Sequence, residues 1–216
     1  MRLPSPVTPA VLLILFPSLS KSNRRRASRY PHGMSAQVSL PQDDVRFPVG
    51  KFEKPAGPIS NDMLSEALRT LAECPEQLRN AVEGLSDPQL ATPYREGGWN
   101  VRQVVHHMAD SHLQAAGRMR LALTEDWPAV LAYNEKAWAE LHDSKAAPVE
   151  WSLEIIESLH ARWVMLLQSL TPEQWPRGYV HSVYGRSTIA EATLLYAWHS
   201  RHHVAHITHL RAARGW

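Results

Sequence analysis

The stretch TIAEATLLYAWHSRHHVAHITHLRAA, residues 188–213, decides the fold that we expect. Its apolar residues recur at intervals of three and four, which is the spacing of one face of an α-helix. Thr188 followed by Glu191 matches a capping box, which marks the start of a helix. The apolar face comprises Ala192, Leu195, Tyr196, Ile207 and Leu210. The stretch therefore predicts a long amphipathic helix that buries this face in a helical core.

Three earlier segments show the same periodicity, at residues 61–86, 100–124 and 149–170. Pro75 has no backbone N–H, so we expect it to kink or break the first of these helices. Asn100 is a suitable N-cap for the second helix. Four long amphipathic helices predict an all-α protein, a four-helix bundle over residues 61–216.

The segments between the predicted helices differ in character. Residues 34–60 are rich in Pro and Gly and predict an extended N-terminal arm. Residues 125–148 form a long connection between the second and third helices, and a connection of that length often serves as a lid or a pocket wall. Residues 176–186 indicate a small hairpin, and the sequence holds no convincing series of strands.

Residues 1–33 hold six basic and no acidic side chains, and we exclude this tail from the fold. Three interpretations remain open for it: an over-extended gene start with Met34 as the first residue, a targeting segment, or a basic arm. Its apolar run at 7–16 is too short to span a membrane.

Residues 34–216 hold 17 basic and 21 acidic side chains, a formal charge of −4. This balance argues against a nucleic-acid partner, and we expect a cytoplasmic protein with no membrane partner.

Five of the twelve histidines lie in the last predicted helix. At about 100° per residue, His199, His203 and His206 fall inside the apolar face, His202 lies on its flank, and His209 lies well away from it. Imidazoles at i, i+4 or at i, i+3 have the geometry of helical metal sites. Ordinary hydrogen bonding explains a single buried pair. Three aligned imidazoles favour a metal ion, because each ring needs buried partners for two nitrogens.

The helix at 100–124 offers a third ligand. His112 lies at the centre of its apolar face, His107 lies at the edge, and His106 points largely away. Periodicity alone therefore prefers His112 and then His107. Three imidazole ligands leave coordination positions open, which is typical of catalytic rather than structural zinc sites. Such an ion activates water at neutral pH or holds a thiol as the thiolate.

Other signatures of metal enzymes are incomplete. The run HSRHH at 199–203 lacks the glutamate of the metalloprotease pattern His-Glu-x-x-His. Glu157 and His160 match the Glu-x-x-His of di-iron bundles once, whereas those proteins need it twice. Glu157 falls off the apolar face of its helix, and His160 lies nearer to it, where it could support a ligand from behind. The lone cysteine, Cys74, excludes an internal disulfide and is best explained as a small buried side chain.

Two stretches, YREGGWNVRQVVHHMADSH at 94–112 and YAWHSRHHVAHITHL at 196–210, closely resemble the YfiT branch of the DinB superfamily. Further similarity lies in FPVGKFEKP at 47–55, AWAELHDSK at 137–145 and SLHARWVMLL at 158–167. The resemblance covers about residues 46–216. It implies a bacterial four-helix bundle of DinB type, in a group labelled as metal-dependent hydrolases. The same superfamily includes enzymes that use the thiols mycothiol or bacillithiol.

The resemblance also implies a set of metal ligands. The family binds one divalent ion, zinc or nickel, through three histidines. One is the histidine of an HxAD run, here His107, and the other two are an i, i+4 pair that matches His199 and His203. The resemblance therefore selects His107 over His112, and it prefers the pair of His199 and His203 to that of His203 and His206.

Two polar residues near these ligands are candidates for catalysis. Asp110 follows His107 by one helical turn, where it could orient a ligand ring or simply face solvent. Arg102, with Arg95 and Gln103, could bind an anionic substrate or serve a surface or capping role.

The sequence thus predicts a metal-dependent enzyme whose ion, held by His107, His199 and His203, activates water to hydrolyse a small-molecule substrate. The alternative is transfer of a low-molecular-weight thiol such as bacillithiol to an electrophile. A second alternative is a non-catalytic bundle that the ion only braces. We expect the chain to form a homodimer.

Overall fold

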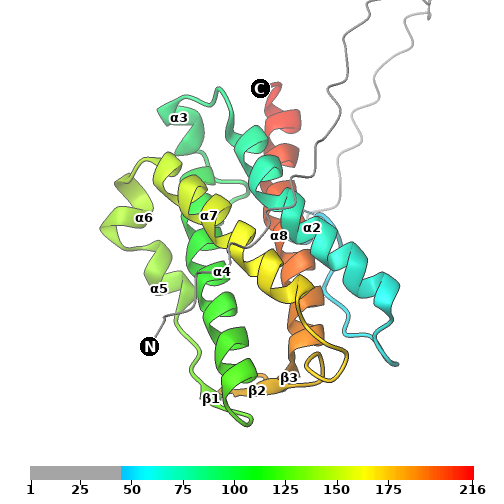
Figure 1. The fold of residues 1–216 in the computed structure, drawn as a ribbon. Coiled ribbons are helices and arrows are strands. Elements are labelled where there is room, and N and C mark those ends of the chain that lie inside the picture. The colour runs from blue at the N-terminus through cyan, green and yellow to red at the C-terminus, as the bar shows by residue number, and fades with distance from the viewer. Residues whose placement is uncertain (1–44) are drawn as a thin grey trace, which may run out of the picture. The chain divides into compact units, whose positions relative to one another are not determined.

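The computed structural model describes residues 45–216, and residues 1–33 of the predicted tail lie outside that range. Four long helices dominate the fold (Figure 1). They are α2 (Asn61–Val82), α4 (Val101–Thr124), α7 (Val149–Gln168) and α8 (Ile189–Arg214). Each begins within a residue or so of its predicted start, and the predicted all-α four-helix bundle is confirmed.

The starts of two helices follow from their capping residues. The Asn100 side chain accepts from the Gln103 backbone N–H at 2.8 Å, and the Gln103 side chain accepts from the Asn100 N–H at 3.0 Å. Thr188 and Glu191 form the same reciprocal pair at the start of α8. These bonds satisfy N–H groups that the first helical turn leaves without partners. They also set the register of the two helices that carry most of the histidines.

Helix α2 continues without interruption through Pro75, so the predicted break at this residue is wrong. Proline removes one N–H from the helical ladder, and the surrounding turns can tolerate that loss when packing holds the helix. The carbonyl that would receive the missing bond, four residues earlier, belongs to Leu71. That carbonyl instead accepts a hydrogen bond from outside its own helix.

The shorter elements lie in the connections. They are α3 (Asp87–Leu90), α5 (Glu135–Ala139), α6 (His142–Ala146), β1 (Ala129–Val130), β2 (Gly178–His181) and β3 (Gly185–Thr188). Strands β2 and β3 form the predicted hairpin, and β1 pairs with β2 in parallel. The sheet lies at the lower end of the bundle in Figure 1, where α4 ends and α8 begins. The sequence did not reveal β1, since two residues are too short to show a period.

Around the bundle the helices follow the order α2, α8, α4, α7, and each packs against its two neighbours in that ring. Two apolar clusters fill the interior. The first includes Leu78, Val105, Met108, Ile156 and Ile207, and the second includes Leu71, Met119, Trp163, Leu167 and Ile189. Along α4, α7 and α8 the boundary between the clusters holds His112, His160 and His199. The core is therefore crossed by a layer of imidazoles.

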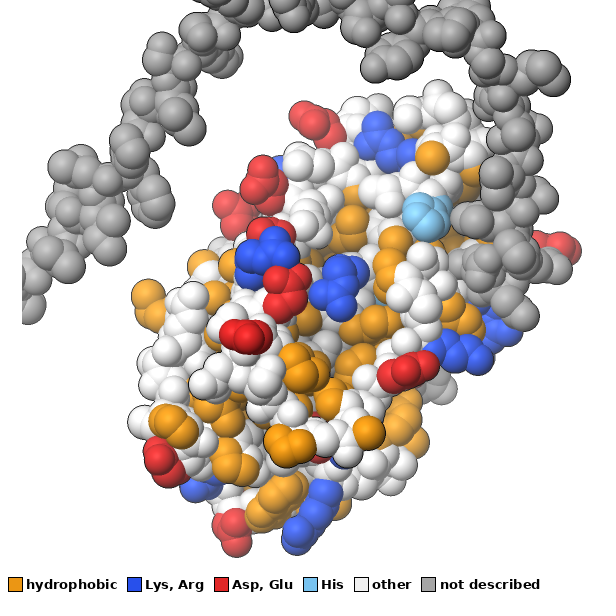
Figure 2. All heavy atoms as spheres, turned by 90° about the vertical axis from the view of Figure 1, so that its right-hand side faces the viewer, with side chains coloured by type: hydrophobic (Ala, Val, Ile, Leu, Met, Phe, Trp, Pro, Cys, Tyr) orange, Lys and Arg blue, Asp and Glu red, His pale blue; other side chains and the backbone are white. Residues whose placement is uncertain are grey.

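The described part of the arm, residues 45–60, packs along α8. The Trp198 indole N–H donates to the Gly50 carbonyl at 3.0 Å, and Lys54 pairs with Glu191 at 2.9 Å. One face of the molecule, shown in Figure 2, carries acidic and basic side chains side by side rather than a patch of one sign. Within residues 45–216, no helix combines the length and the apolar character needed to cross a membrane.

Candidate metal centre

Three imidazoles meet where α4 faces α8. His107 extends from α4, and His199 and His203 extend from successive turns of α8. Each offers a nitrogen, and the three nitrogens lie within 4.8 Å of one another. The Nε2 atoms of His107 and His199 are 3.3 Å apart. The structure therefore brings together the three residues that the resemblance selects.

The geometry of this cluster fits a divalent ion. Zinc binds imidazole nitrogen at about 2.0–2.1 Å with tetrahedral angles, so two ligands on one ion lie about 3.3 Å apart. The spacing of the two Nε2 atoms agrees with that value. His203 Nδ1 is buried and has no hydrogen-bond partner among residues 45–216. A metal ion would use nitrogens that the protein leaves without a complete set of partners.

Burial keeps these imidazoles in the form that binds metal. His107 and His203 are only 8% and 7% exposed, whereas His199 is more accessible. Burial, together with the neighbouring His202, lowers the pKa of His107 to about 4. Burial also holds the pKa of His199 and of His203 well below the ordinary value. The rings are therefore neutral at pH 7, as metal ligation requires.

A tight turn before α4 positions one wall of the site. Gly97 has a φ of 63°, a left-handed conformation that favours glycine. The turn closes with a hydrogen bond from the Tyr94 N–H to the Trp99 carbonyl at 3.1 Å. It places the Trp99 ring 4.6 Å from the His107 ring and 6.5 Å from that of His203. The indole excludes water from one side of the cluster and restricts the rotation of His107.

His112, the ligand that periodicity prefers, lies behind the cluster rather than in it. It is fully buried, and its Nε2 lies 3.0 Å from His199 Nδ1. On its other side, its Nδ1 lies 2.7 Å from His160 Nε2. The helical wheel identified His112 as the most inward imidazole of α4, which is correct. Depth in the core does not decide which imidazole faces the other ligands.

Two further histidines are buried although the sequence placed them outside the apolar face. His106 Nδ1 lies 2.7 Å from the Ser152 hydroxyl oxygen, and His106 Nε2 lies 3.2 Å from the Ala147 carbonyl oxygen. The prediction that His106 points away is wrong, because the long connection and the start of α7 cover that side of α4. His202 is 8% exposed because the arm covers the flank of α8. His209 is exposed, as predicted.

The other polar candidates have separate surroundings. Arg102 donates to the Ala147 carbonyl and to Asp87, each at 2.8 Å, and so holds the connection against α4. Asp110 is half-buried, and its side chain has no hydrogen bond within the described range. Burial, with the nearby Asp143, raises the pKa of Asp110 to about 6. Gln103 serves as a cap and also donates to the Ala139 carbonyl.

A second group of imidazoles shares His203 with the first. His202, His203 and His206 also offer nitrogens within 4.8 Å of one another. The His202 ring stacks on Trp198 at 4.5 Å and the His206 ring stacks on Tyr94 at 4.0 Å. These two rings lie flat against aromatic neighbours, so they fill the space between α8, the arm and the turn before α4.

A surface hollow of about 610 Å³ lies apart from the three ligands, between α2 and α7. Its lining includes Arg79, Glu157, His160 and Met165. Glu157 is exposed there and pairs with Arg79 at 3.0 Å, so it takes no part in the histidine cluster. His160 borders this hollow from inside and is 1% exposed.

Sequence reasoning missed the contacts that link these histidines to each other. It placed His160 where it could support a ligand from behind, but it did not foresee that Trp99 packs on His107, or that His112 stands between His160 and His199. One signal was present, since Pro75 leaves the carbonyl of Leu71 without its helical donor. Recognising which side chain supplies the missing donor requires the packing of α7 against α2.

Comparison with known proteins agrees with the fold. The sequence pattern of the DinB superfamily matches residues 70–207. The "Putative metal-dependent hydrolase YfiT" of Bacillus subtilis is 47% identical over 174 residues, covering 80% of this chain and 97% of that protein. A "Putative metal-dependent hydrolase" of Bacillus anthracis strain A0248 is also 47% identical over 174 residues, covering 81% of this chain and 99% of its own length.

A solved structure shows the same architecture. YfiT from B. subtilis, described as a probable metal-dependent hydrolase with an unusual four-helix bundle topology, superposes with a TM-score of 0.77. The two chains are 46% identical, and the match covers 80% of this chain and 99% of YfiT. With its four helices and its sequence similarity in agreement, this chain belongs to the YfiT-like branch of the DinB superfamily.

Proposed function

We propose that the protein is a metal-dependent enzyme that uses a zinc or nickel ion, bound by His107, His199 and His203, to hydrolyse a small-molecule substrate. The observation that carries this proposal is the 3.3 Å spacing of the His107 and His199 Nε2 atoms beside a third, unpartnered imidazole. The names of the relatives support it, since they describe metal-dependent hydrolases. When bound, such an ion lowers the pKa of a coordinated water to about 7.

The ligand count favours catalysis over a structural role. Structural zinc sites are closed by four protein ligands, whereas catalytic sites keep a position for water or substrate. The cluster offers three imidazoles, and His199 retains access to solvent. Trp99 covers one side, so we expect a substrate to approach from the side where His199 is accessible.

Asp110 is the candidate for moving a proton during the reaction. It lies one turn after His107, and its pKa of about 6 lets it both accept and release a proton near neutral pH. Asp110→Asn keeps the shape of the side chain and removes this capacity. We expect the variant to bind metal normally and to lose activity by roughly 10²–10⁴-fold, the usual contribution of a general acid or base.

Arg102 is assigned to holding the connection between α4 and α7 against α4. Measuring the KM of Arg102→Ala tests whether this side chain also binds substrate.

Metal analysis of the purified protein tests the ligand set. We expect one ion per chain in the wild type, loss of that ion in His203→Ala, and a full complement in His209→Ala. His209 is the matched control because it is an exposed histidine on the same helix. Stoichiometric metal in a folded His203→Ala variant would contradict the assignment.

A substrate panel then separates the candidate reactions. The metal-loaded protein is assayed on esters and amides, with and without a low-molecular-weight thiol. Hydrolysis without thiol supports the proposal, and turnover only with thiol identifies a thiol S-transferase instead. If neither occurs and removing the metal strongly lowers the melting temperature, the ion braces the bundle and the hydrolase proposal fails.

The same proposal includes a homodimer and a cytoplasmic location. Sedimentation of the full chain measures the first, with a molecular mass near twice 24.4 kDa expected. Fractionation of cells that produce the protein measures the second. A monomer, or a protein recovered outside the cytoplasm, would contradict the corresponding statement and leave the metal site unaffected.

A further inference from the structure

A line of hydrogen bonds connects helix α2 to the candidate metal centre. It begins at the Leu71 carbonyl, which lies 2.6 Å from His160 Nδ1. His160 Nε2 lies 2.7 Å from His112 Nδ1, and His112 Nε2 lies 3.0 Å from His199 Nδ1. The line takes one residue from each of the four long helices, and it ends at a residue whose other nitrogen faces His107.

Pro75 explains why the line can begin where it does. In an uninterrupted helix, the N–H of residue 75 would donate to the carbonyl of residue 71. Proline has no N–H, so the Leu71 carbonyl is left as a buried acceptor inside α2. A buried acceptor without a partner is unfavourable, and the imidazole of His160 supplies the donor.

The order of donors and acceptors follows from that first bond. A carbonyl oxygen only accepts, so the proton of His160 is on Nδ1. Neutral His160 then accepts at Nε2, which requires His112 to donate from Nδ1. His112 in turn accepts at Nε2, which requires His199 to donate from Nδ1. His199 Nε2 is therefore left with a lone pair.

The surroundings enforce neutral rings and fixed orientations. His112 is fully buried and His160 is 1% exposed, and a charged imidazole at that depth would be strongly unfavourable. Trp163 packs edge-on against both rings, and Tyr196 packs edge-on against His112. Reversing one tautomer would place two N–H groups or two lone pairs against each other, which is unfavourable for buried groups that have no other partner.

We propose that Leu71, Pro75, His160 and His112 form a tautomer relay, which holds His199 with its proton on Nδ1 and its Nε2 lone pair directed at the metal position. The part of this proposal that concerns the ion rests on the proposed function. The hydrogen-bond order itself does not need an ion. His112 and His160 are positioning residues, since they act on the ion only through His199.

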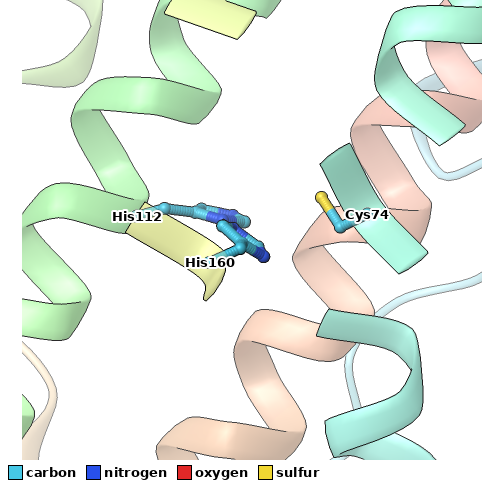
Figure 3. Close-up of side chains that lie close together, drawn as sticks. All are labelled: Cys74, His112 and His160. Carbon is cyan, nitrogen blue, oxygen red and sulfur yellow. The ribbon is translucent and has the colours of Figure 1, made fainter. Parts of the chain in front are cut away.

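Cys74 offers a competing explanation for the same histidines. Its sulfur can approach nitrogens of His112 and His160 within 4.8 Å, so the three could hold a second ion. Figure 3 shows the two rings close together and Cys74 opposite them on α2. The facing nitrogens are only 2.7 Å apart, closer than the roughly 3.3 Å of two ligands on one zinc ion. Burial also raises the pKa of the Cys74 thiol to about 11, which opposes the thiolate that zinc requires.

Nuclear magnetic resonance of the metal-free full chain tests the relay directly. Long-range ¹H–¹⁵N spectra of histidine report which ring nitrogen carries the proton. We expect His160, His112 and His199 all to be protonated on Nδ1 only. A proton on Nε2 of any of the three would overturn the proposal. Because no metal is present, this result is independent of whether the ligand assignment is correct.

Metal affinity provides the second test, with His106 as the matched control. His160→Leu removes the first imidazole of the relay, which is separated from the metal position by His112 and His199. We expect a 10–100-fold loss of Co²⁺ affinity and an altered Co²⁺ absorption spectrum. His106→Leu removes another buried, hydrogen-bonded histidine, on α4, that lies outside the relay. We expect that variant to lose stability and keep its affinity. Equal affinity losses in the two variants, or none in a folded His160→Leu, would overturn the proposal.

Pro75→Ala and Cys74→Ser complete the design if His160→Leu does not fold. Pro75→Ala returns a competing donor to the Leu71 carbonyl, and we expect the His160 Nδ1 proton resonance to shift upfield as its bond weakens. An unchanged resonance would contradict the role of Pro75.

Cys74→Ser should leave one ion per chain. Two ions in the wild type and one in Cys74→Ser would overturn the relay in favour of a second metal site.

Discussion

Helix α8 carries two pairs of histidines that have different surroundings. The ligand pair, His199 and His203, faces α4, where His107 presents a nitrogen 3.3 Å from His199. The stacked pair, His202 and His206, faces the arm and the turn before α4. The His206 ring lies flat on Tyr94 of that turn, and the His202 ring lies flat on Trp198 of α8 itself, with Phe47 of the arm nearby. All four side chains come from two turns of one helix.

The comparison shows that the opposing element decides what an imidazole does. Opposite the ligand pair stands the His107 imidazole, and the three rings meet tilted or edge to face, with nitrogens that converge within 4.8 Å. Opposite the stacked pair stand aromatic faces and the Arg46 carbonyl, which lies 3.3 Å from His206 Nε2. Nitrogens of His202, His203 and His206 also lie within 4.8 Å of one another, but the His202 and His206 rings are held flat against aromatic neighbours, which contributes packing energy.

The largest expected effect is loss of the ion. His107→Ala removes the ligand that α4 contributes, and we expect metal content near zero and activity equal to that of the chelated protein. His206→Ala removes a stacked ring and should keep one ion per chain. Elemental analysis of the two variants decides the matter. Loss of metal in His206→Ala with retention in His107→Ala would move the site to the stacked pair.

Removing the ion from the wild type should lower stability by a smaller, measurable amount. A ligand that binds only the folded state at 1,000 times its dissociation constant adds about 4 kcal/mol. We expect chelation to lower the melting temperature of the wild type and of stacked-pair variants, and to leave that of His199→Ala unchanged. A chelator-dependent melting shift in His199→Ala would show that the ion does not depend on the ligand pair.

Acid should destabilise the metal-free protein through the stacked pair. Burial lowers the pKa of His202 to about 4, and burial with the charge of His202 lowers that of His206 to about 3. The unfolded chain binds protons near pH 6.5, so it gains protons first as the pH falls. The contribution of His202 and His206 to the free energy of unfolding is therefore complete above about pH 6.5, and it is lost progressively as the pH falls toward 3.

Urea unfolding at pH 7.5, 6 and 5 measures this loss. Each unit of pKa difference is worth about 1.4 kcal/mol, so the wild type should lose a few kcal/mol over that range. The double variant His202→Phe/His206→Phe keeps aromatic rings and removes both titrating groups, and it should lose less. An equal loss in both proteins would show that other groups, such as the ligand pair, dominate the acid response.

The smallest expected effect concerns packing alone. His206→Leu removes the contact with the Tyr94 ring, and we expect a loss of about 1 kcal/mol in the free energy of unfolding. His209→Leu, on the exposed side of the same helix, should change stability by less than about 0.5 kcal/mol. A similar change in both variants would mean that stacking contributes nothing measurable.

Several features followed from sequence alone because they depend on neighbours along the chain. Asn100 and Thr188 cap their helices as predicted, since a capping box involves residues three apart. The inward position of His112 and the outward position of His209 followed from the helical period. The three-histidine set required the family resemblance as well, because periodicity alone ranked His112 above His107.

What the sequence did not reveal arose at contacts between distant segments. His106 and His202 are buried by the long connection and by the arm, and neither segment has a period that reveals where it packs. The continuous path of α2 through Pro75 depends on packing that propensity does not describe.

The sequence by itself determined the four helices, the capped starts of α4 and α8, and the inward direction of most of the histidines, because these are local consequences of side-chain spacing. Only the tertiary structure decided which imidazoles meet nitrogen to nitrogen, which stack on aromatic rings, and which stand behind His199. The hydrogen-bonding contacts depend on distances of 2.6–3.3 Å between atoms on separate helices, and the stack of His206 on Tyr94 joins α8 to the turn before α4. A helical period specifies the direction of a side chain, whereas packing specifies its partner.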